Sequence, residues 1–273
     1  MTDLIQKIGK SIIQHGSEND RIYLMRFAGR AEALIKKLDQ ICLENKYSKI
    51  FAKIPASSAP AFIANNFKIE AFVPRFFKGR EDCFFVAKYF SKNRSKISEK
   101  ELTILQNFPK SKKNSKNINS SPYKIKKIQK GDALKLAELY RKTFKSYPFP
   151  IDSKKYLLET IQENVIYFGA WQDDKLIGAA SAEIDQDFLN AEMTDFAVAP
   201  KFRGNNLALI LLARAEKEMK NLGIKTLYTI ARLNSFGMNA TFLKAGYAFS
   251  GTLVNNTNIA GSLESMNVWY KQV

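Results

Sequence analysis

One stretch of the chain combines residue types that bind phosphate with a spacing that would place them at the start of a helix. Residues 190–199 are mostly apolar and have the length of a strand. Apolar residues then recur at helical spacing from Leu207 to Met219, and Gly223 is a candidate helix end. The turn between the two, residues 200–206, would present backbone N–H groups at a helix N-terminus, where anions bind. The sequence therefore predicts a phosphate-binding loop; the plainer alternative is an ordinary strand–turn–helix with an exposed Arg-Gly pair.

The residues of this turn resemble the signature V-x-P-x-Y/F-R-G-x-G-x-A/G of the GNAT superfamily of acyl-CoA N-acyltransferases. The matching positions are Val198, Pro200, Phe202, Arg203, Gly204 and Ala208. Asn206 stands where the family usually has glycine. Because asparagine tolerates positive φ best among the other residues, we expect the loop still to form.

The resemblance implies that acetyl-CoA is the co-substrate and that it binds through the backbone. The acetyl and pantetheine arms would lie along Phe196, Ala197 and Val198. The pyrophosphate would be held by the loop residues Arg203, Gly204, Asn205, Asn206, Leu207 and Ala208.

Two carboxylates precede the loop on the predicted strand. Acetylating an amine at neutral pH requires a base, because the ammonium has a pKa of about 10.4 and must lose a proton before it attacks. Glu192 lies six residues before Val198, where several GNAT enzymes keep a glutamate base, and a period of two places both on one face. Asp195 points to the other face unless a β-bulge intervenes, as GNAT strands commonly carry here. Glu192 and Asp195 are therefore the predicted catalytic residues, with Glu192 as the base and Asp195 as the first alternative; otherwise Glu192 is an edge carboxylate that faces solvent.

The sequence leaves open which group protonates the departing thiolate. GNAT enzymes often use a tyrosine of the last helix, but counting back four residues from Gly246 gives Phe242, which cannot donate a proton. We expect Phe242 to pack in the core. Either Tyr228 or Tyr247 substitutes for it, or the thiolate leaves unaided. By the same resemblance, a backbone N–H would hold the oxyanion of the tetrahedral intermediate.

Cysteine and histidine are too few for several kinds of catalytic chemistry. Cys42 and Cys83 form no metal or redox spacing, and His15 is the single histidine. Zinc clusters and Ser-His-Asp chemistry are therefore nearly excluded, and we expect no metal. The cysteine usage fits a reducing, cytoplasmic location. No apolar run approaches the ~18 residues of a membrane span, and the first residues lack the apolar segment of a signal peptide.

The net charge of +17 raises the question of nucleic-acid binding. Residues 88–130 contain 13 Lys or Arg against two acidic residues, Glu99 and Glu101. Within this segment, the low-complexity run Pro109–Pro122 is typical of a solvated linker. We therefore expect the charge to serve mostly as a tether and a nucleic-acid partner to be absent; polyanion binding by this segment is the alternative.

The elements expected after the linker follow the order of the GNAT fold. Residues 123–273 predict β-α-α-β-β-β-α-β-α-β-β, with Asp152 capping the second helix and Asp173-Asp174 turning a hairpin. The predicted fold class is α/β (α+β), a GNAT-type mixed sheet flanked by helices. Three parts are expected: a degenerate GNAT-like half-domain (1–90), a basic polar linker (91–122) and a catalytic GNAT domain (123–273). The sequence leaves the oligomeric state open.

The N-terminal part resembles the second half of the catalytic domain. Residues 61–67 (AFIANNF) align with residues 241–247 (TFLKAGY), and each run follows an amphipathic helix and a strand and precedes two further strands. Residues 26–30 (RFAGR) lack the lead of a phosphate loop. The sequence thus predicts a degenerate half-domain that packs on the catalytic one; a coincidence between two α/β units is the alternative.

Several polar residues are candidates for binding a small diamino acid as the acceptor. Carboxylates for its ammonium groups are Asp195, Glu264 and Glu183; partners for its carboxylate are Asn239, Asn255 and Arg232. The runs Met193–Phe196, Gly237–Phe242 and Leu263–Tyr270 also resemble the β-lysine N-acetyltransferases within the superfamily. This implies transfer to the side-chain amine of β-lysine, giving the osmolyte Nε-acetyl-β-lysine. A protein or tRNA acetyltransferase using the basic linker, and a non-catalytic acyl-CoA-binding module, are the alternatives.

Overall fold

The computed structural model describes residues 3–108 and 122–273. The chain forms two compact units that interleave along the sequence. Unit 1 consists of Met1–Phe108, Arg232–Asn234 and Ser250–Val268. Unit 2 consists of Pro109–Ala231, Ser235–Phe249 and Trp269–Val273.

Part of the predicted linker is helical. Helix α3 spans Glu99–Gln106, with Ser98 and Glu101 forming a capping box at its N-terminus. All but the last residue of the low-complexity run Pro109–Pro122 lies outside the described residues.

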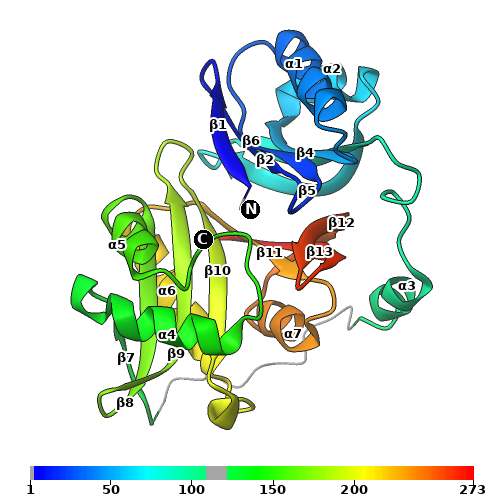
Figure 1. Ribbon diagram of the computed structural model, residues 1–273. Helices are drawn as coiled ribbons and strands as arrows, with labels where there is room; N and C mark the ends of the chain where they lie inside the picture. Colours follow the sequence, from blue (N-terminus) through cyan, green and yellow to red (C-terminus); the bar gives the residue numbers. More distant parts are fainter. Residues whose placement is uncertain (1–2, 109–121) are drawn as a thin grey trace. The chain divides into compact units, whose positions relative to one another are not determined.

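The sheet that carries the predicted catalytic strand has seven strands in the order β12-β13-β11-β10-β9-β8-β7 (Figure 1). Its strands are β7 (Lys124–Lys127), β8 (Val165–Gln172), β9 (Lys175–Asp185), β10 (Asn190–Val198), β11 (Thr226–Arg232), β12 (Ala248–Ile259) and β13 (Ser262–Gln272). Strands β10 and β11 are parallel, whereas β7 to β10 pair antiparallel in sequence. This mixed sheet, with its helices, confirms the predicted fold class.

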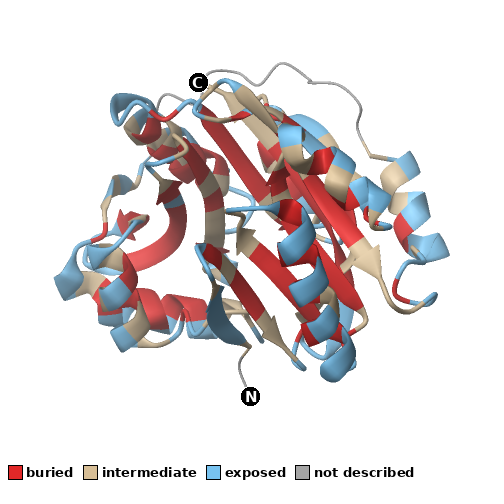
Figure 2. Cartoon of the chain, turned by 90° about the horizontal axis from the view of Figure 1, so that it is seen from above, coloured by how far each residue is buried: buried red, intermediate tan, exposed pale blue. Residues whose placement is uncertain are grey.

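Helices of unit 2 contact both faces of the sheet. They are α4 (Ala133–Thr143), α5 (Lys154–Gln162), α6 (Leu207–Asn221) and α7 (Phe236–Lys244). Successive residues of β8 contact different helices. Tyr167 packs in the apolar cluster of α4 and α5, whereas the ring of Phe168 lies 5.7 Å from the guanidinium of Arg214 on α6. The helices bury one stripe each and leave the other exposed (Figure 2), as amphipathic helices do.

Local sequence signals fix several boundaries of these elements. Asp173 turns the β8–β9 hairpin at φ 51°, which confirms the predicted turn. Gly223 follows α6 at φ 75°, in the left-handed conformation that ends many helices. The prediction that Asp152 caps α5 is wrong by one residue. Ser153 is the N-cap, and its hydroxyl accepts a hydrogen bond from the N–H of Tyr156 at 3.5 Å.

Unit 1 contains a six-stranded sheet in the order β1-β2-β3-β4-β6-β5. Its strands are β1 (Leu4–Ile8), β2 (Ser11–Gly16), β3 (Arg21–Arg26), β4 (Lys49–Pro55), β5 (Lys68–Phe77) and β6 (Glu81–Tyr89). Helices α1 (Ala31–Glu44) and α2 (Ala59–Ala64) share an apolar core with β3, β4 and β6.

The two sheets repeat one topology. The order β3-β4-β6-β5 matches β10-β11-β13-β12, and the first two strands of each series are parallel. The helix ends also match, because the N–H of Phe67 donates to Phe62 and that of Tyr247 donates to Phe242. The two ring pairs are both edge-on, with centroids 5.0 and 5.1 Å apart. The two sheets thus share a strand order, the pairing direction of their first strands and a helix-end hydrogen bond.

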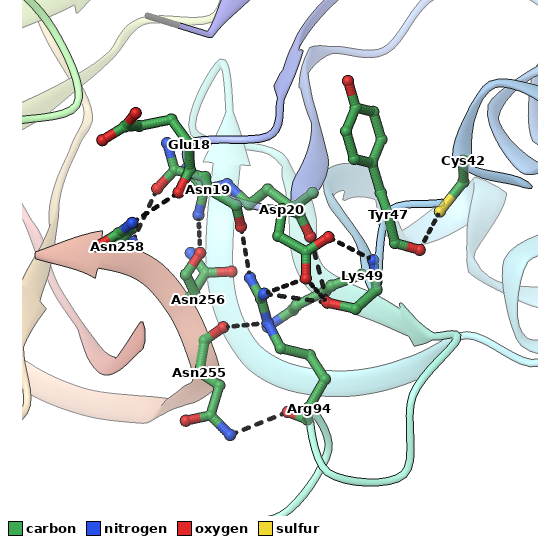
Figure 3. Close-up of polar contacts among 12 residues, drawn as sticks. Glu18, Asn19, Asp20, Cys42, Tyr47, Lys49, Arg94, Asn255, Asn256 and Asn258 are labelled. Atoms are coloured by element: carbon green, nitrogen blue, oxygen red, sulfur yellow. Dashed lines mark hydrogen bonds and ion pairs between the residues drawn. The ribbon is translucent and has the colours of Figure 1, made fainter. Parts of the chain in front are cut away.

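Strand β12 is held within unit 1 by three cations. They bind the successive backbone carbonyls of residues 254–256: Lys49 donates to the first at 2.8 Å, Arg94 to the second at 2.7 Å and Arg21 to the third. Asn255 has φ 45°, which breaks the strand's alternation and lets neighbouring carbonyls reach one group of cations. Figure 3 shows the part of this network around Arg94 and Asn255.

Among residues 3–108 and 122–273, no helix combines the length and apolar character needed to cross a membrane.

Candidate active site

The loop between β10 and α6 contains two residues in the left-handed conformation. Gly204 lies at φ 84° and Asn206 at φ 55°, so the expected left-handed conformation of Asn206 is confirmed. The Nε of Arg203 donates to the carbonyl of Val198 at 3.2 Å and ties the loop to the end of the strand. Helix α6 begins at Leu207, and N–H groups in a first helical turn have no acceptor within the helix. The loop thus presents backbone donors at the positive end of a helix dipole.

The residues present fit a pyrophosphate at this loop. Residues 203–206 are exposed, and a Cβ built on Gly204 would meet no atom within 4 Å. A ligand can therefore approach the backbone of Gly204 without a steric barrier.

Strand β10 continues past the residues that pair with its parallel neighbour, β11. In the described part of the chain, the ladder between β10 and β11 pairs residues 190–192 with residues 226–228. The strands themselves continue to Val198 and Arg232. The backbone of residues 196–198 therefore lies past the end of this ladder, where an extended ligand arm can hydrogen-bond to it as a strand would.

A β-bulge lies on β10 at the point where the ladder has ended. Thr194 pairs with Ser181 and Ala197 with Ala179, so two residues of β10 oppose one residue of β9. Asp195 is the first of the two and has φ 52°, an uncommon conformation for a residue other than glycine. The strand thus contains the bulge that turns Asp195 away from strict alternation.

The bulge brings the Asp195 carboxylate against two hydroxyl groups from other elements. Tyr147, in the loop between α4 and α5, donates to Oδ1 at 2.5 Å, and Ser181 of β9 donates to Oδ2 at 2.6 Å. The Tyr147 hydroxyl also lies 3.5 Å from that of Thr194. Consecutive side chains of β10 thus reach the same hydroxyl, which strict alternation along a strand would not allow.

The surroundings of Asp195 are aromatic. Burial raises the pKa of Asp195 above its ordinary value, against the opposing effect of the hydrogen bonds from Ser181, Tyr147 and Thr194. Burial raises the pKa of four nearby tyrosines, and the negative charge of Asp195 raises each of them further. They are Tyr140, Tyr147, Tyr156 and Tyr167. These hydroxyls therefore stay protonated at neutral pH, and that of Tyr147 donates to the carboxylate.

Glu192 lies three residues earlier, at the last pair of the ladder. It is partly buried, and it is opposite Glu183 on β9 and Tyr228 on β11. Its charge contributes to the raised pKa of Tyr147, so Glu192 and Asp195 act on the same group. The structure thus brings the two predicted carboxylates together around the bulge.

The residues considered for the proton donor lie in packed surroundings. Phe242 is 1% exposed and packs edge-on against Phe196 and Tyr247, which confirms that it is a core residue. Burial, with the nearby carboxylate of Glu216, raises the pKa of Tyr247 well above its ordinary value. Tyr228 is also buried.

Two of the candidate acceptor-binding residues form an ion pair in unit 1. Arg232 donates through Nε and Nη2 to the two carboxylate oxygens of Glu264 at 2.8 and 2.6 Å. The Arg232 side chain is 46% exposed and that of Glu264 is 11% exposed, so the pair is accessible from one end. The residues that follow the pair in sequence also meet, because the N–H of Leu233 donates to the carbonyl of Ser265 at 2.9 Å.

The other candidates have different surroundings. Asn239 is fully buried; its side chain donates to the carbonyl of Ser235 and accepts from the indole N–H of Trp269. The side-chain amide of Asn255 donates to the carbonyls of residues 94 and 96. Glu183 is exposed on β9. The amides of Asn239 and Asn255 thus hydrogen-bond within the fold.

Sequence reasoning missed Tyr147 and Ser181. Tyr147 lies in the run Ser146–Pro150, whose two prolines are typical of a turn. Ser181 interrupts an apolar stretch of β9, and it is fully buried. A lone hydroxyl within a buried strand needs a polar partner, and that requirement could have indicated Ser181. Nothing in the sequence indicated that Tyr147 would be the other donor to the same carboxylate.

Comparisons with known proteins agree with this geometry. Residues 133–247 match the model of the acetyltransferase (GNAT) family. The chain is 41% identical over 269 residues to Beta-lysine N(6)-acetyltransferase of Methanococcus maripaludis, covering 98% of each chain. It is 32% identical over 265 residues to N-acetyltransferase YodP of Bacillus subtilis, covering 96% of each. It is also 31% identical over 272 residues to Beta-lysine N(6)-acetyltransferase of Methanosarcina mazei, covering 91% of this chain and 100% of the relative.

The matched region contains the bulged strand, the left-handed loop and the helix that follows it. The likeness to the relatives also extends over both units of the chain. The chain belongs to the GNAT family of acetyltransferases.

Proposed function

We propose that this protein transfers the acetyl group of acetyl-CoA to the N6 amine of β-lysine, giving Nε-acetyl-β-lysine. The observation that carries the proposal is the combination of two features of β10. The strand leads into a loop that can bind an anion at the start of α6, and its bulge carries a carboxylate. The acceptor is proposed from the two β-lysine acetyltransferases, which are 41% and 31% identical to nearly the whole chain.

The loop and strand residues would hold acetyl-CoA. Arg203, Gly204, Asn205, Asn206, Leu207 and Ala208 would bind the pyrophosphate, and Phe196, Ala197 and Val198 the acetyl and pantetheine arms. The bound co-substrate supplies an activated acetyl thioester. Support comes from the left-handed conformations in the loop and from the end of the β10–β11 ladder before residue 196.

A carboxylate of β10 would accept the proton that the substrate ammonium must lose. The sequence favoured Glu192, with Asp195 as the alternative. The geometry supports Asp195, because it lies past the end of the ladder, whereas Glu192 is paired at the ladder's last position. The neutral amine then forms the C–N bond of the amide, the C–S bond breaks, and the second amine proton leaves with the thiol.

The acceptor's remaining charges need partners of opposite sign. Within unit 1, Glu264 and Arg232 present such charges and pair with each other. The side-chain amide of Asn239 hydrogen-bonds to Ser235 and Trp269. We therefore propose that Asn239 acts by holding α7 in position and not by contacting the acceptor. We also propose a cytoplasmic location, from the reduced state of Cys42 and Cys83.

A thiol-release assay with acetyl-CoA tests the acceptor. The panel contains β-lysine, L-lysine, spermidine and a peptide with a free N-terminus. We expect the highest kcat/KM with β-lysine. L-lysine, whose second amine is on C2 instead of C3, should give a lower value. Turnover of the peptide with none of β-lysine would overturn the proposal and favour a protein acetyltransferase. Binding of acetyl-CoA without turnover of any amine would favour an acyl-CoA-binding module.

A further inference from the structure

The carboxylate of Asp195 is held at both oxygens by hydroxyl donors that no sequence motif singled out. One donor is Tyr147, from the loop between α4 and α5, and the other is Ser181, from the antiparallel neighbour β9. Both distances, 2.5 and 2.6 Å, are those of strong hydrogen bonds from O–H to a carboxylate. Both donors precede Asp195 in the sequence, by 48 and 14 residues.

These two hydrogen bonds counter two unfavourable features of Asp195: its strained backbone and the burial of its charge. The backbone of Asp195 is in a conformation that costs about 1 kcal/mol or more, so it persists only where its surroundings fix it. Burial also disfavours the charged form of the carboxylate. Each hydroxyl donor acts against both, because it fixes the orientation of the side chain and stabilises its negative charge.

We propose that Tyr147 and Ser181 are positioning residues that orient the ionised Asp195 carboxylate to receive the proton of a primary ammonium group. The inference rests on the proposed function, in which a carboxylate of β10 is the proton acceptor. One proton passes from the substrate nitrogen to a carboxylate oxygen and later to solvent. Each oxygen accepts one hydroxyl and keeps lone-pair capacity for that proton.

Tyr147 is suited to this role because its own position is fixed by packing. Its ring centroid lies 5.0 Å from that of Phe144, at the end of α4. The ring of Tyr147 is therefore held against Phe144, while its hydroxyl reaches Asp195 on β10. Tyr140 provides a natural comparison: it is fully buried and close enough to interact with Asp195, but in the described residues its hydroxyl has no hydrogen-bond partner.

Other titratable groups surround the site and bear on any pH dependence. They are Tyr140 of α4, Tyr147 of the α4–α5 loop, Tyr156 and Glu163 at α5, Tyr167 of β8, Glu183 of β9 and Glu192 of β10. The tyrosines have raised pKa values, so they do not titrate below neutral pH. Among these tyrosines and Asp195, the carboxylate is therefore the group that loses its charge on acidification.

The test compares the pH profile of kcat/KM for three variants of the full chain with that of the wild type. In Y147F and S181A, a donor to the charged form is lost, so the pKa of Asp195 rises. We expect the acidic limb of the profile to move upward by about one pH unit, the scale set by a hydrogen bond to a charged group. The KM for acetyl-CoA should stay unchanged. Y140F, which loses a hydroxyl without a partner, should keep the wild-type limb.

The inference is overturned if the acidic limb moves in neither Y147F nor S181A. It is also overturned if Y140F shows an equal shift. A second readout is independent of turnover. The carboxyl carbons of aspartate are labelled with ¹³C in wild type, Y147F and S181A, and the signal absent from D195N is titrated. A higher titration midpoint in both variants supports the inference even if β-lysine is not the acceptor; an unchanged midpoint contradicts it. Failure of the proposed function alone would appear instead as absent turnover of β-lysine by the wild type.

Discussion

At the scale of single residues, the site depends on a carboxylate that a bulge has turned. Without the bulge between Thr194 and Ala197, Asp195 would lie on the opposite face from its neighbour. With it, Thr194 and Asp195 both reach the Tyr147 hydroxyl. The chemistry proposed for this chain therefore depends on one extra residue in β10 and on the left-handed backbone that accommodates it.

The first prediction separates the two carboxylates. D195N keeps the shape of the side chain but accepts no proton, so we expect kcat to fall by about 10² to 10³, within the usual range for a general base. E192Q should lose less. Both variants should still bind acetyl-CoA, which calorimetry can check.

Part of the loss in D195N should be recovered at high pH, where more of the amine arrives deprotonated. A larger loss in E192Q than in D195N would return the role of base to Glu192, as the sequence first suggested. Equal, small losses would point to a water molecule held by backbone groups as the proton acceptor.

At the scale of elements, the loop and the strand were largely predictable and the bulge contacts were not. The strand–loop–helix order, the left-handed Asn206 and the end of α6 before Gly223 follow from local preferences, which short stretches of sequence contain. The Tyr147–Asp195 contact joins segments 48 residues apart. Whether they meet depends on how α4 and its loop pack on the sheet, and no local pattern specifies that.

The second prediction concerns the one departure from the family's loop signature. N206G should bind acetyl-CoA as well as the wild type, because glycine adopts φ 55° without strain. N206V should bind about 5- to 30-fold more weakly, because a β-branched residue at positive φ costs roughly 1–2 kcal/mol.

Isothermal titration calorimetry with acetyl-CoA measures both affinities. Equal binding by N206V and N206G would show that the left-handed conformation is not needed for the co-substrate. R203E serves as a further comparison: it places a carboxylate next to the pyrophosphate and should abolish binding.

At the scale of the whole molecule, the sequence predicted the kinds of elements in the N-terminal part but not where its polar residues act. The repeated order β3-β4-β6-β5 could be anticipated from the aligned runs at residues 61–67 and 241–247. The assignment of Ser250–Val268 to the same compact unit as residues 1–108 could not. It depends on contacts separated by more than 150 residues, such as that from Arg94 to the carbonyl of Asn255.

The third prediction tests this long-range attachment. Lys49 is fully buried, its pKa is lowered to about 8 by burial, and it pairs with Glu70 at 2.9 Å. K49M leaves the buried Glu70 carboxylate without its cation, which typically costs about 3–5 kcal/mol of unfolding free energy. The double variant K49M/E70Q removes the charge of both and should recover part of the loss. Urea unfolding measures each free energy.

K88M is the matched control. Lys88 pairs with Asp39 at 2.7 Å, but both side chains are partly exposed, so we expect a loss below about 1 kcal/mol. A K49M protein as stable as K88M would show that the buried pair does not fasten β12 to the N-terminal sheet.

The central claim is that the chain acetylates β-lysine on N6, and one measurement tests it most directly. The protein is mixed with β-lysine and acetyl-CoA carrying ¹³C in the acetyl carbonyl, and the product is followed by NMR. We predict a ¹³C carbonyl signal coupled to the amide proton of N6, whose neighbouring CH₂ protons shift with it, and no signal on N3. An acetyl group on N3, or no labelled product with β-lysine while another amine is acetylated, would contradict the account.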